Sequence, residues 1–272
     1  MSRDERRYWI EQMEAAHGFM RRLLEYPLVE CGEPLASLTD AARAAGVEII
    51  FPAGKKLGMF DRIFCVRRSL VEPLMRVGET LLKRGYILRV EDAYRSPDVQ
   101  AHGAGSAYAV GHVLEKVRWE LDGQAPTADL VFRRLATWTA TTLKLANHTF
   151  GSAVDVTVVR RDGAPVDLGG TYPELSVRTP MDSPWISAEV RRHRRMMCDA
   201  FAAEGFVPYP FEFWHFSCGD ADCEMIRDSG RPGRFGPVHL GAEGEISPVE
   251  DVLRPLVTKA DVARCLEEHK LL

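Results

Sequence analysis

The sequence predicts an α+β fold in which helices pack on a mostly antiparallel central sheet. In several segments apolar residues recur three and four positions apart, as on one face of a helix, whereas other short segments are rich in β-branched residues, as strands are. These segments do not alternate in the regular strand–helix rhythm of a parallel sheet. The chain of 272 residues contains no repeat and no long linker, so we expect residues 1–272 to form one domain.

The expected helices are bounded by residues that commonly start or stop a helix. Pro27 follows the first amphipathic segment, and Gly85 is a suitable C-cap for the second. Thr258 is a suitable N-cap for the last. The expected helices are 3–25, 69–84, 129–146, 187–204 and 259–268.

Strands are expected where β-branched and aromatic residues cluster. Pro208 and Pro210 interrupt the last of these clusters. The segment 96–127 contains several glycines and no clear period, so we expect a loop with one short helix there. The expected strands are 47–51, 86–93, 154–159 and 207–217.

The composition is typical of a globular protein and argues against two classes of partner. With 46% hydrophobic residues, 27% charged residues and a net charge of −4, the chain has no bias toward nucleic acid. The basic run 191–195 is more typical of a solvated helix face. No apolar stretch is long enough to span a membrane, and the charged N-terminus does not resemble a secretory signal, so cytoplasmic residence is the default expectation. The sequence gives no indication of the oligomeric state.

Six cysteines are scattered along the chain, and we expect them to be reduced. Cys218 and Cys223 flank two aspartates, which is compatible with a second metal site. No matching pair of ligands is found elsewhere in the sequence, so we consider that site the weaker hypothesis.

Two separated segments supply residues that commonly bind zinc. His148 lies seven positions before Asp155, with Gly151 between them allowing a tight turn, and Asp155 begins a β-branched run. Such a pair is also typical of a structural hydrogen bond. Glu212 and His215 lie among aromatic residues, where a buried charge requires a partner. The alternative is a Glu–His ion pair at a sheet edge.

One geometric requirement follows from the spacing of the second pair. In a regular strand, residues three apart point to opposite faces, so Glu212 and His215 can act together only if the chain bends near Trp214. Arg95 completes the set, because it follows an expected strand and its guanidinium can bind a carbonyl or carboxylate oxygen. The alternative for Arg95 is a surface salt bridge. Two imidazoles, a carboxylate ligand and a second carboxylate are the components of a catalytic zinc site.

These residues lie in motifs that resemble those of the VanX-type D-alanyl-D-alanine dipeptidases, which are zinc D,D-peptidases with a Hedgehog-like fold. The motifs are Tyr-Arg-Ser-Pro at 94–97, His-x-x-Gly-Ser-Ala-x-Asp at 148–155 and Glu-x-Trp-His at 212–215. The resemblance covers about 65–217. It leaves residues 1–64 as an N-terminal extension and 218–272 as a C-terminal tail.

The resemblance implies a role for each residue. His148, Asp155 and His215 would bind one zinc ion per chain, Glu212 would be the catalytic base, and Arg95 would stabilise the oxyanion. Tyr94 and Trp214, inside the same motifs, would contact the substrate. The sequence departs from the family at Ala146, where a serine is usual, and in the loop 169–175, where Glu174 would have to replace the aspartate that binds the substrate's ammonium group.

We therefore expect a zinc dipeptidase whose partner is a small peptide substrate such as D-Ala-D-Ala. Two alternatives remain open. One is a D,D-carboxypeptidase or amidase that uses the same site on longer or N-acylated peptides. The other is a zinc-binding module without catalytic activity, against which Glu212 and Arg95 argue.

Overall fold

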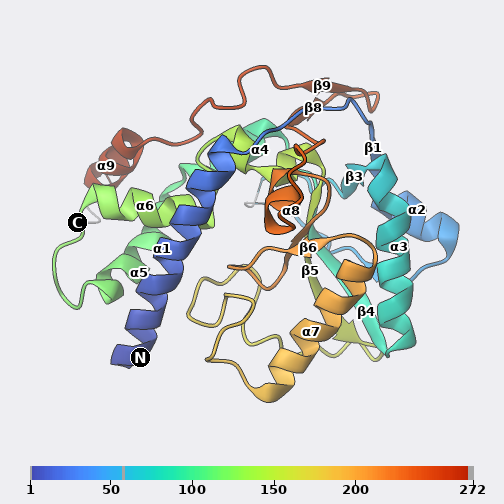
Figure 1. Cartoon of the computed structure of the whole chain (residues 1–272), viewed down its shortest axis with the longest axis horizontal. Coiled ribbons are helices and arrows are strands. Elements are labelled where there is room, and N and C mark those ends of the chain that lie inside the picture. Colours follow the sequence, from blue (N-terminus) through green and yellow to red (C-terminus); the bar gives the residue numbers. More distant parts are fainter. Residues whose placement is uncertain (1, 57–58, 269–272) are drawn as a thin grey trace. The chain divides into compact units, whose positions relative to one another are not determined.

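The computed structural model describes residues 2–56 and 59–268 (Figure 1). Its contacts divide the chain into two compact units, between which the chain passes repeatedly. The first contains the described residues of 1–25, 97–146 and 250–272, and the second contains those of 26–96 and 147–249. The assignment of the whole chain to one domain stays a prediction. None of the helices in the described ranges has the length and apolar character needed to cross a membrane.

The first unit is helical. It consists of α1 (Arg3–Glu25), α4 (Pro97–Ala104), α5 (Ala107–Glu120), α6 (Ala128–Trp138), the short 3₁₀ helix η1 (Leu143–Leu145) and α9 (Lys259–Glu268). The expected first and last helices are confirmed. A buried ion pair joins α5 and α6, in which Arg134 of α6 donates to Glu120 of α5 at 2.8 Å.

Two expectations for this unit are wrong. The segment expected to be mostly loop forms α4 and α5, and the side chain of Ser106 caps α5 by accepting from the Ala109 amide. The buried residues Val110, Val113, Leu114 and Val117 of α5 do recur three and four positions apart, but the glycines in and beside this segment led to the expectation of a loop. The helix expected over 129–146 ends at Trp138, where Thr139 is extended. A run of threonines, which favour extended backbone, follows that position.

The second unit contains a five-stranded sheet. In spatial order its strands are β2 (Ile49–Ile50), β4 (Tyr86–Asp92), β5 (Ala153–Arg160), β7 (His215–Ser217) and β6 (Val207–Pro208). Only β2 and β4 pair in parallel, and the other neighbours are antiparallel. This confirms the α+β class and the mostly antiparallel sheet.

Smaller elements complete this unit. Two small antiparallel sheets have two strands each. One pairs β1 (Leu35–Ser37) with β3 (Cys65–Arg67), and the other pairs β8 (Val238–Leu240) with β9 (Ile246–Pro248). The helices are α2 (Leu38–Ala45), α3 (Arg68–Lys83), η2 (Asn147–Phe150), α7 (Ala188–Ala203) and α8 (Ala221–Ile226). Of these, the sequence predicted α3 and α7 within one or two residues. All six cysteines are unpaired, as expected.

The two faces of β5 have different roles. Val154, Val156 and Val158 are buried in the core, to which α3 and α7 contribute residues such as Leu74 and Phe201. Because side chains alternate along a strand, Asp155 and Thr157 point to the opposite face. The apolar face therefore anchors the strand, while the other face is available for polar groups.

The expectation of one continuous strand over 207–217 is wrong, and the difference affects the site. It forms β6, a turn and β7, and the turn is closed by the Glu212 amide donating to Tyr209 O at 3.3 Å and the His215 amide donating to Glu212 O at 3.3 Å. Pro208 and Pro210 prevent a continuous ladder. The turn removes the difficulty of spacing, because Glu212 lies outside the regular strand that carries His215.

Two local irregularities align the polar residues. A bulge between Val90 and Asp92 shifts the register so that Asp92 lies opposite Asp155. Gly151 has φ +70°, and a Cβ there would lie 2.3 Å from Leu35 Cδ2, so the turn between η2 and β5 requires glycine.

Replacing Gly151 with alanine should lower the free energy of unfolding. A left-handed alanine costs about 1–2 kcal/mol, and crowding against Leu35 should add about 1–3 kcal/mol. The change in the free energy of unfolding is measured by urea denaturation, with circular dichroism as the signal. Gly163→Ala is the matched control, because Gly163 has φ +83° with nothing within 4 Å of the added Cβ. Equal losses in the two variants would show that Leu35 is not crowded.

Candidate metal centre

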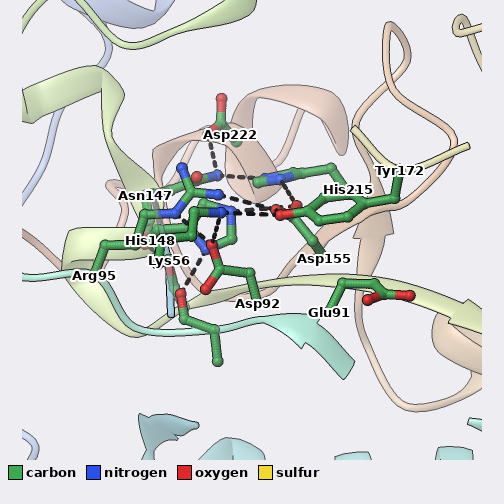
Figure 2. Close-up of polar contacts among 12 residues, drawn as sticks. Lys56, Glu91, Asp92, Arg95, Asn147, His148, Asp155, Tyr172, His215 and Asp222 are labelled. Carbon is green, nitrogen blue, oxygen red and sulfur yellow. Dashed lines mark hydrogen bonds and ion pairs between the residues drawn. The ribbon is translucent and has the colours of Figure 1, made fainter. Parts of the chain in front are cut away.

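The two histidines and the aspartate expected to bind zinc converge in the second unit. One ligand atom from each of His148, Asp155 and His215 lies within 4.8 Å of the others, and all three residues are buried (Figure 2). In the described ranges this is the one group of three or more such residues placed to hold a metal ion. The sheet register explains the convergence, because Asp155 on β5 lies directly opposite His215 on β7. His148 comes from η2, immediately before the Gly151 turn.

Hydrogen bonds orient both imidazole rings toward Asp155. The Nδ1 atom of His148 lies 2.6 Å from the Ala93 carbonyl oxygen, which requires a proton on Nδ1 and leaves the Nε2 lone pair 3.2 Å from Asp155 Oδ1. The ring of His215 is turned the other way, with Nδ1 2.9 Å from the same oxygen. Bonding of the outer ring nitrogen to a carbonyl is typical of a metal-binding histidine.

The protonation states of His148 and Asp155 also suit a cation. Burial, followed by the charge of Arg95, lowers the pKa of His148, so the ring is neutral. Burial alone would raise the pKa of Asp155, but its interactions with the His148 and His215 rings hold it well below its ordinary value. Two imidazole nitrogens and one ionised carboxylate are the donor set of a catalytic zinc site, so these residues fit that ion.

Glu212 lies beside this cluster in the turn before β7. Burial raises its pKa to about 7, and its charge interacts with those of His215, Asp155 and Arg95. A hydrogen bond from the Trp214 side chain opposes the rise. A carboxyl group that titrates near neutrality is suited to exchange protons at physiological pH.

Arg95 is part of a partly buried ionic network, so the alternative of a surface salt bridge is wrong. Its Nε donates to Asp92 Oδ2 at 2.6 Å and its Nη2 donates to Asp155 Oδ2 at 3.0 Å. Its side chain is 20% exposed. The guanidinium is therefore held next to the three converging residues by two carboxylates.

The network includes residues that the sequence did not suggest. Lys56 donates to Asp92 Oδ2 at 2.5 Å and to the Tyr172 hydroxyl at 3.1 Å. The Tyr172 hydroxyl donates to Asp155 Oδ2 at 3.0 Å. Burial, followed by the charge of Arg95, lowers the pKa of Lys56. These residues come from separate segments without a recognisable motif, although Asp92 lies only three positions before Arg95.

The residues expected to contact substrate lie in three different environments. Tyr94 is buried, and its hydroxyl donates to the Val238 carbonyl, away from the cluster. Trp214 is buried and packs edge-on against Tyr172 with 5.6 Å between ring centroids. Glu174 is exposed and accepts a hydrogen bond from the Thr171 hydroxyl within its own turn. Substrate contact by these residues stays a prediction.

Comparison with known proteins identifies the family. A family model described as D-Ala-D-Ala dipeptidase, of the M15 peptidases, matches residues 55–229. The chain belongs to this family. The M15 D-Ala-D-Ala dipeptidase family is one of zinc metallopeptidases, so the chain is a metallopeptidase and the expected resemblance is confirmed.

The comparisons also found individual proteins that are similar to this chain. A D-alanyl-D-alanine dipeptidase of Synechocystis sp. is 27% identical over 233 residues, covering 74% of this chain and 88% of that protein. One from Escherichia coli K12 is 29% identical over 76 residues, covering 28% of this chain and 39% of that protein. A crystal structure of a mutant vancomycin resistance D,D-pentapeptidase VanY with Zn(II) covers 75% of this chain and 94% of its own, with 15% identity and a TM-score of 0.38.

Removal of any of the three converging side chains should abolish stoichiometric zinc binding. His148→Ala, Asp155→Ala and His215→Ala each leave only two protein donors, and the open site needs three. Zinc content after dialysis, measured by atomic absorption, tests this. The control is Cys218→Ser with Cys223→Ser, which would lose zinc only if the alternative cysteine site existed. Zinc retained at one equivalent in the His148 variant would contradict the assignment.

Proposed function

We propose that this M15 family member is a zinc-dependent dipeptidase that hydrolyses D-Ala-D-Ala or a closely related small dipeptide. The observation that carries the proposal is the buried His148–Asp155–His215 cluster with Glu212 beside it. The names of the two curated relatives support the choice of substrate.

In this proposal His148 Nε2, an Asp155 carboxylate oxygen and His215 Nδ1 would hold one zinc ion per chain. Zinc supplies Lewis acidity, which makes water nucleophilic near neutral pH and polarises a peptide carbonyl group. The protein residues hold these three donors in fixed orientations. The Ala93 carbonyl fixes the His148 tautomer, and the Tyr172 hydroxyl and Arg95 bind the second oxygen of Asp155.

Glu212 is assigned to proton transfer. Its carboxylate takes a proton from the attacking water and passes it to the nitrogen of the leaving amino acid. A pKa of about 7 serves both steps, because the group accepts and releases a proton at little cost. Positioned acid–base groups of this kind contribute about 10²–10⁴-fold to rate.

Arg95 is assigned to the negative charge that develops on the carbonyl oxygen. Asp92 and Asp155 hold its guanidinium in place before substrate binds, so little reorganisation is needed during the reaction. Loss of one such donor typically costs about 2.7–4 kcal/mol of transition-state stabilisation.

A second candidate is a D,D-carboxypeptidase or amidase that acts on longer or N-acylated peptides with the same site. The position of Glu174 favours it, because the carboxylate expected to bind a free ammonium group is exposed and bonded to Thr171. The two candidates differ only in the amino-terminal side of the substrate, so a common set of peptides separates them.

Zinc-loaded protein should hydrolyse free D-Ala-D-Ala faster than N-acetyl-D-Ala-D-Ala. The Glu212→Gln variant should still bind zinc, but its kcat should be about 10²–10⁴-fold lower. Both rates are measured by using chromatography to monitor the release of D-alanine. A preference for the acetylated peptide would favour the second candidate. If the protein binds zinc but hydrolyses neither peptide, and replacing Glu212 changes no measured rate, the chain is a zinc-binding module without catalytic activity.

The value of kcat/KM should fall as the pH is lowered through about 7. Glu212 acts as a base only when ionised, its pKa is about 7, and the fraction ionised decreases below that value. A bound zinc ion stabilises the ionised form of Glu212. In zinc-loaded protein the midpoint of the fall in kcat/KM should therefore lie at or below about pH 7. Rates are measured with zinc content determined at every pH. A constant rate between about pH 5 and 8 with zinc retained would contradict the role of Glu212.

A further inference from the structure

The outer ring nitrogen of His215 faces a short chain of polar side chains. His215 Nε2 lies 3.1 Å from Asn147 Nδ2, and the same Nδ2 atom donates to Asp222 Oδ2 at 2.7 Å (Figure 2). All three residues are buried. Asn147 comes from η2, next to His148, and Asp222 comes from the first turn of α8. Neither residue has a role in the function proposed above.

This arrangement suits His215 only when its proton is on Nδ1, where it points to Asp155. Then Nε2 has a lone pair and accepts from the Asn147 amide. A metal ion on Nδ1 requires the lone pair there, so the proton of the neutral ring must move to Nε2. The Nε2–H group would then face the Asn147 NH₂ group, and two donors would oppose each other at 3.1 Å.

Rotation of the Asn147 side-chain amide by half a turn resolves this conflict. The amide oxygen and nitrogen have nearly the same size, and the hydrogen-bond network decides which occupies each position. After rotation, Oδ1 accepts from His215 Nε2–H. The same oxygen then lies where Nδ2 was, 2.7 Å from Asp222 Oδ2, and that contact requires a proton on Asp222.

The surroundings of Asp222 favour the protonated form. Burial, followed by the charge of Asp220, raises its pKa well above the ordinary value. Burial raises the pKa of Asp220 as well, but it accepts from the Ser152 and Ser217 hydroxyls and the Cys223 amide, so Asp220 ionises more readily than Asp222. The buried Oδ1 atom of Asp222 has no hydrogen-bond partner among the described residues, and such an atom costs less in a neutral carboxyl group than in a carboxylate.

We propose that Asn147 and Asp222 are positioning residues for the zinc site. In the loaded protein the Asp222 carboxyl group and His215 Nε2–H both donate to Asn147 Oδ1, which holds the His215 ring with Nδ1 toward the metal. This inference rests on the proposed zinc site but not on peptidase activity. It implies that metal loading reverses the direction of the hydrogen bonds along the chain from His215 to Asp222.

Three variants test the direction of these hydrogen bonds through zinc affinity, measured at equilibrium by competition with a chromogenic chelator. Asn147→Ala removes the acceptor and should weaken zinc binding about 10–100-fold, as loss of a group supporting a metal ligand typically does. Asn147→Asp provides only acceptor oxygens and should retain the native affinity. Asp222→Asn replaces the neutral acid with an amide that still donates, and should also retain it.

The opposite pattern would overturn the proposal. If Asp222→Asn lowers the zinc affinity as much as Asn147→Ala does, Asp222 acts as a carboxylate, and the proposed direction of its hydrogen bond to Asn147 is wrong. Loss of affinity in Asn147→Asp would mean that His215 requires a donor at that position. Native affinity in Asn147→Ala would mean that the chain does not position His215. Thr157→Val is the matched control, because it removes the hydrogen bond to Glu91 at 2.6 Å on the same sheet face without touching His215.

Nuclear magnetic resonance of protein labelled with ¹⁵N-histidine gives a readout that a merely structural role would not affect. The zinc-loaded native protein should show a slowly exchanging proton on His215 Nε2, and Asn147→Asp and Asp222→Asn should keep it. Its absence from the native protein would overturn the proposal even if Asn147→Ala fails to fold. Native protein that binds no zinc would reject the proposed function itself, whereas zinc binding without peptide hydrolysis would reject only the activity.

Discussion

The site depends on one buried charge, the carboxylate of Asp155 at the centre of the sheet. An ionised carboxylate removed from water is costly unless several donors or a cation compensate it. One oxygen of Asp155 faces both His148 and His215, and the other accepts from Arg95 and Tyr172. The first oxygen is thus directed at the position that suits a metal ion, and the second holds the residues that surround it.

The sheet explains why this charge can be held in place. The valines of β5 are buried in the core on one face, so the register of the strand is strongly determined. The opposite face must then carry Asp155 between β4 and β7. The bulge in β4 places Asp92 opposite Asp155, and His215 lies opposite it on β7. Packing on the apolar face therefore determines the geometry of the polar face.

The charges around Asp155 are arranged as a balanced set to which a dication and an acid–base group can be added. Asp92 and Asp155 are matched by Lys56 and Arg95, and burial favours the neutral ring of His148. A bound zinc ion would then leave the site positive, even after Glu212 is ionised. In the proposed function, such a site would favour a substrate with a negatively charged group, such as the free carboxylate of a dipeptide.

The sequence by itself determined the α+β class, the strand β5, the helices α1, α3, α7 and α9, and the three residues that converge on one point. These features rest on local signals: apolar periodicity, β-branched runs, and histidines and acids among apolar neighbours. Tertiary structure alone decided that Lys56 and Tyr172 join Asp92 beside the site and that Asp222 lies behind His215. Those contacts join residues that are far apart along the chain, and no local pattern encodes them. The turn at Glu212 shows the same limit, because the prolines signal a break in the strand, but only the pairing of β6 with β7 determines where the broken segment directs its carboxylate.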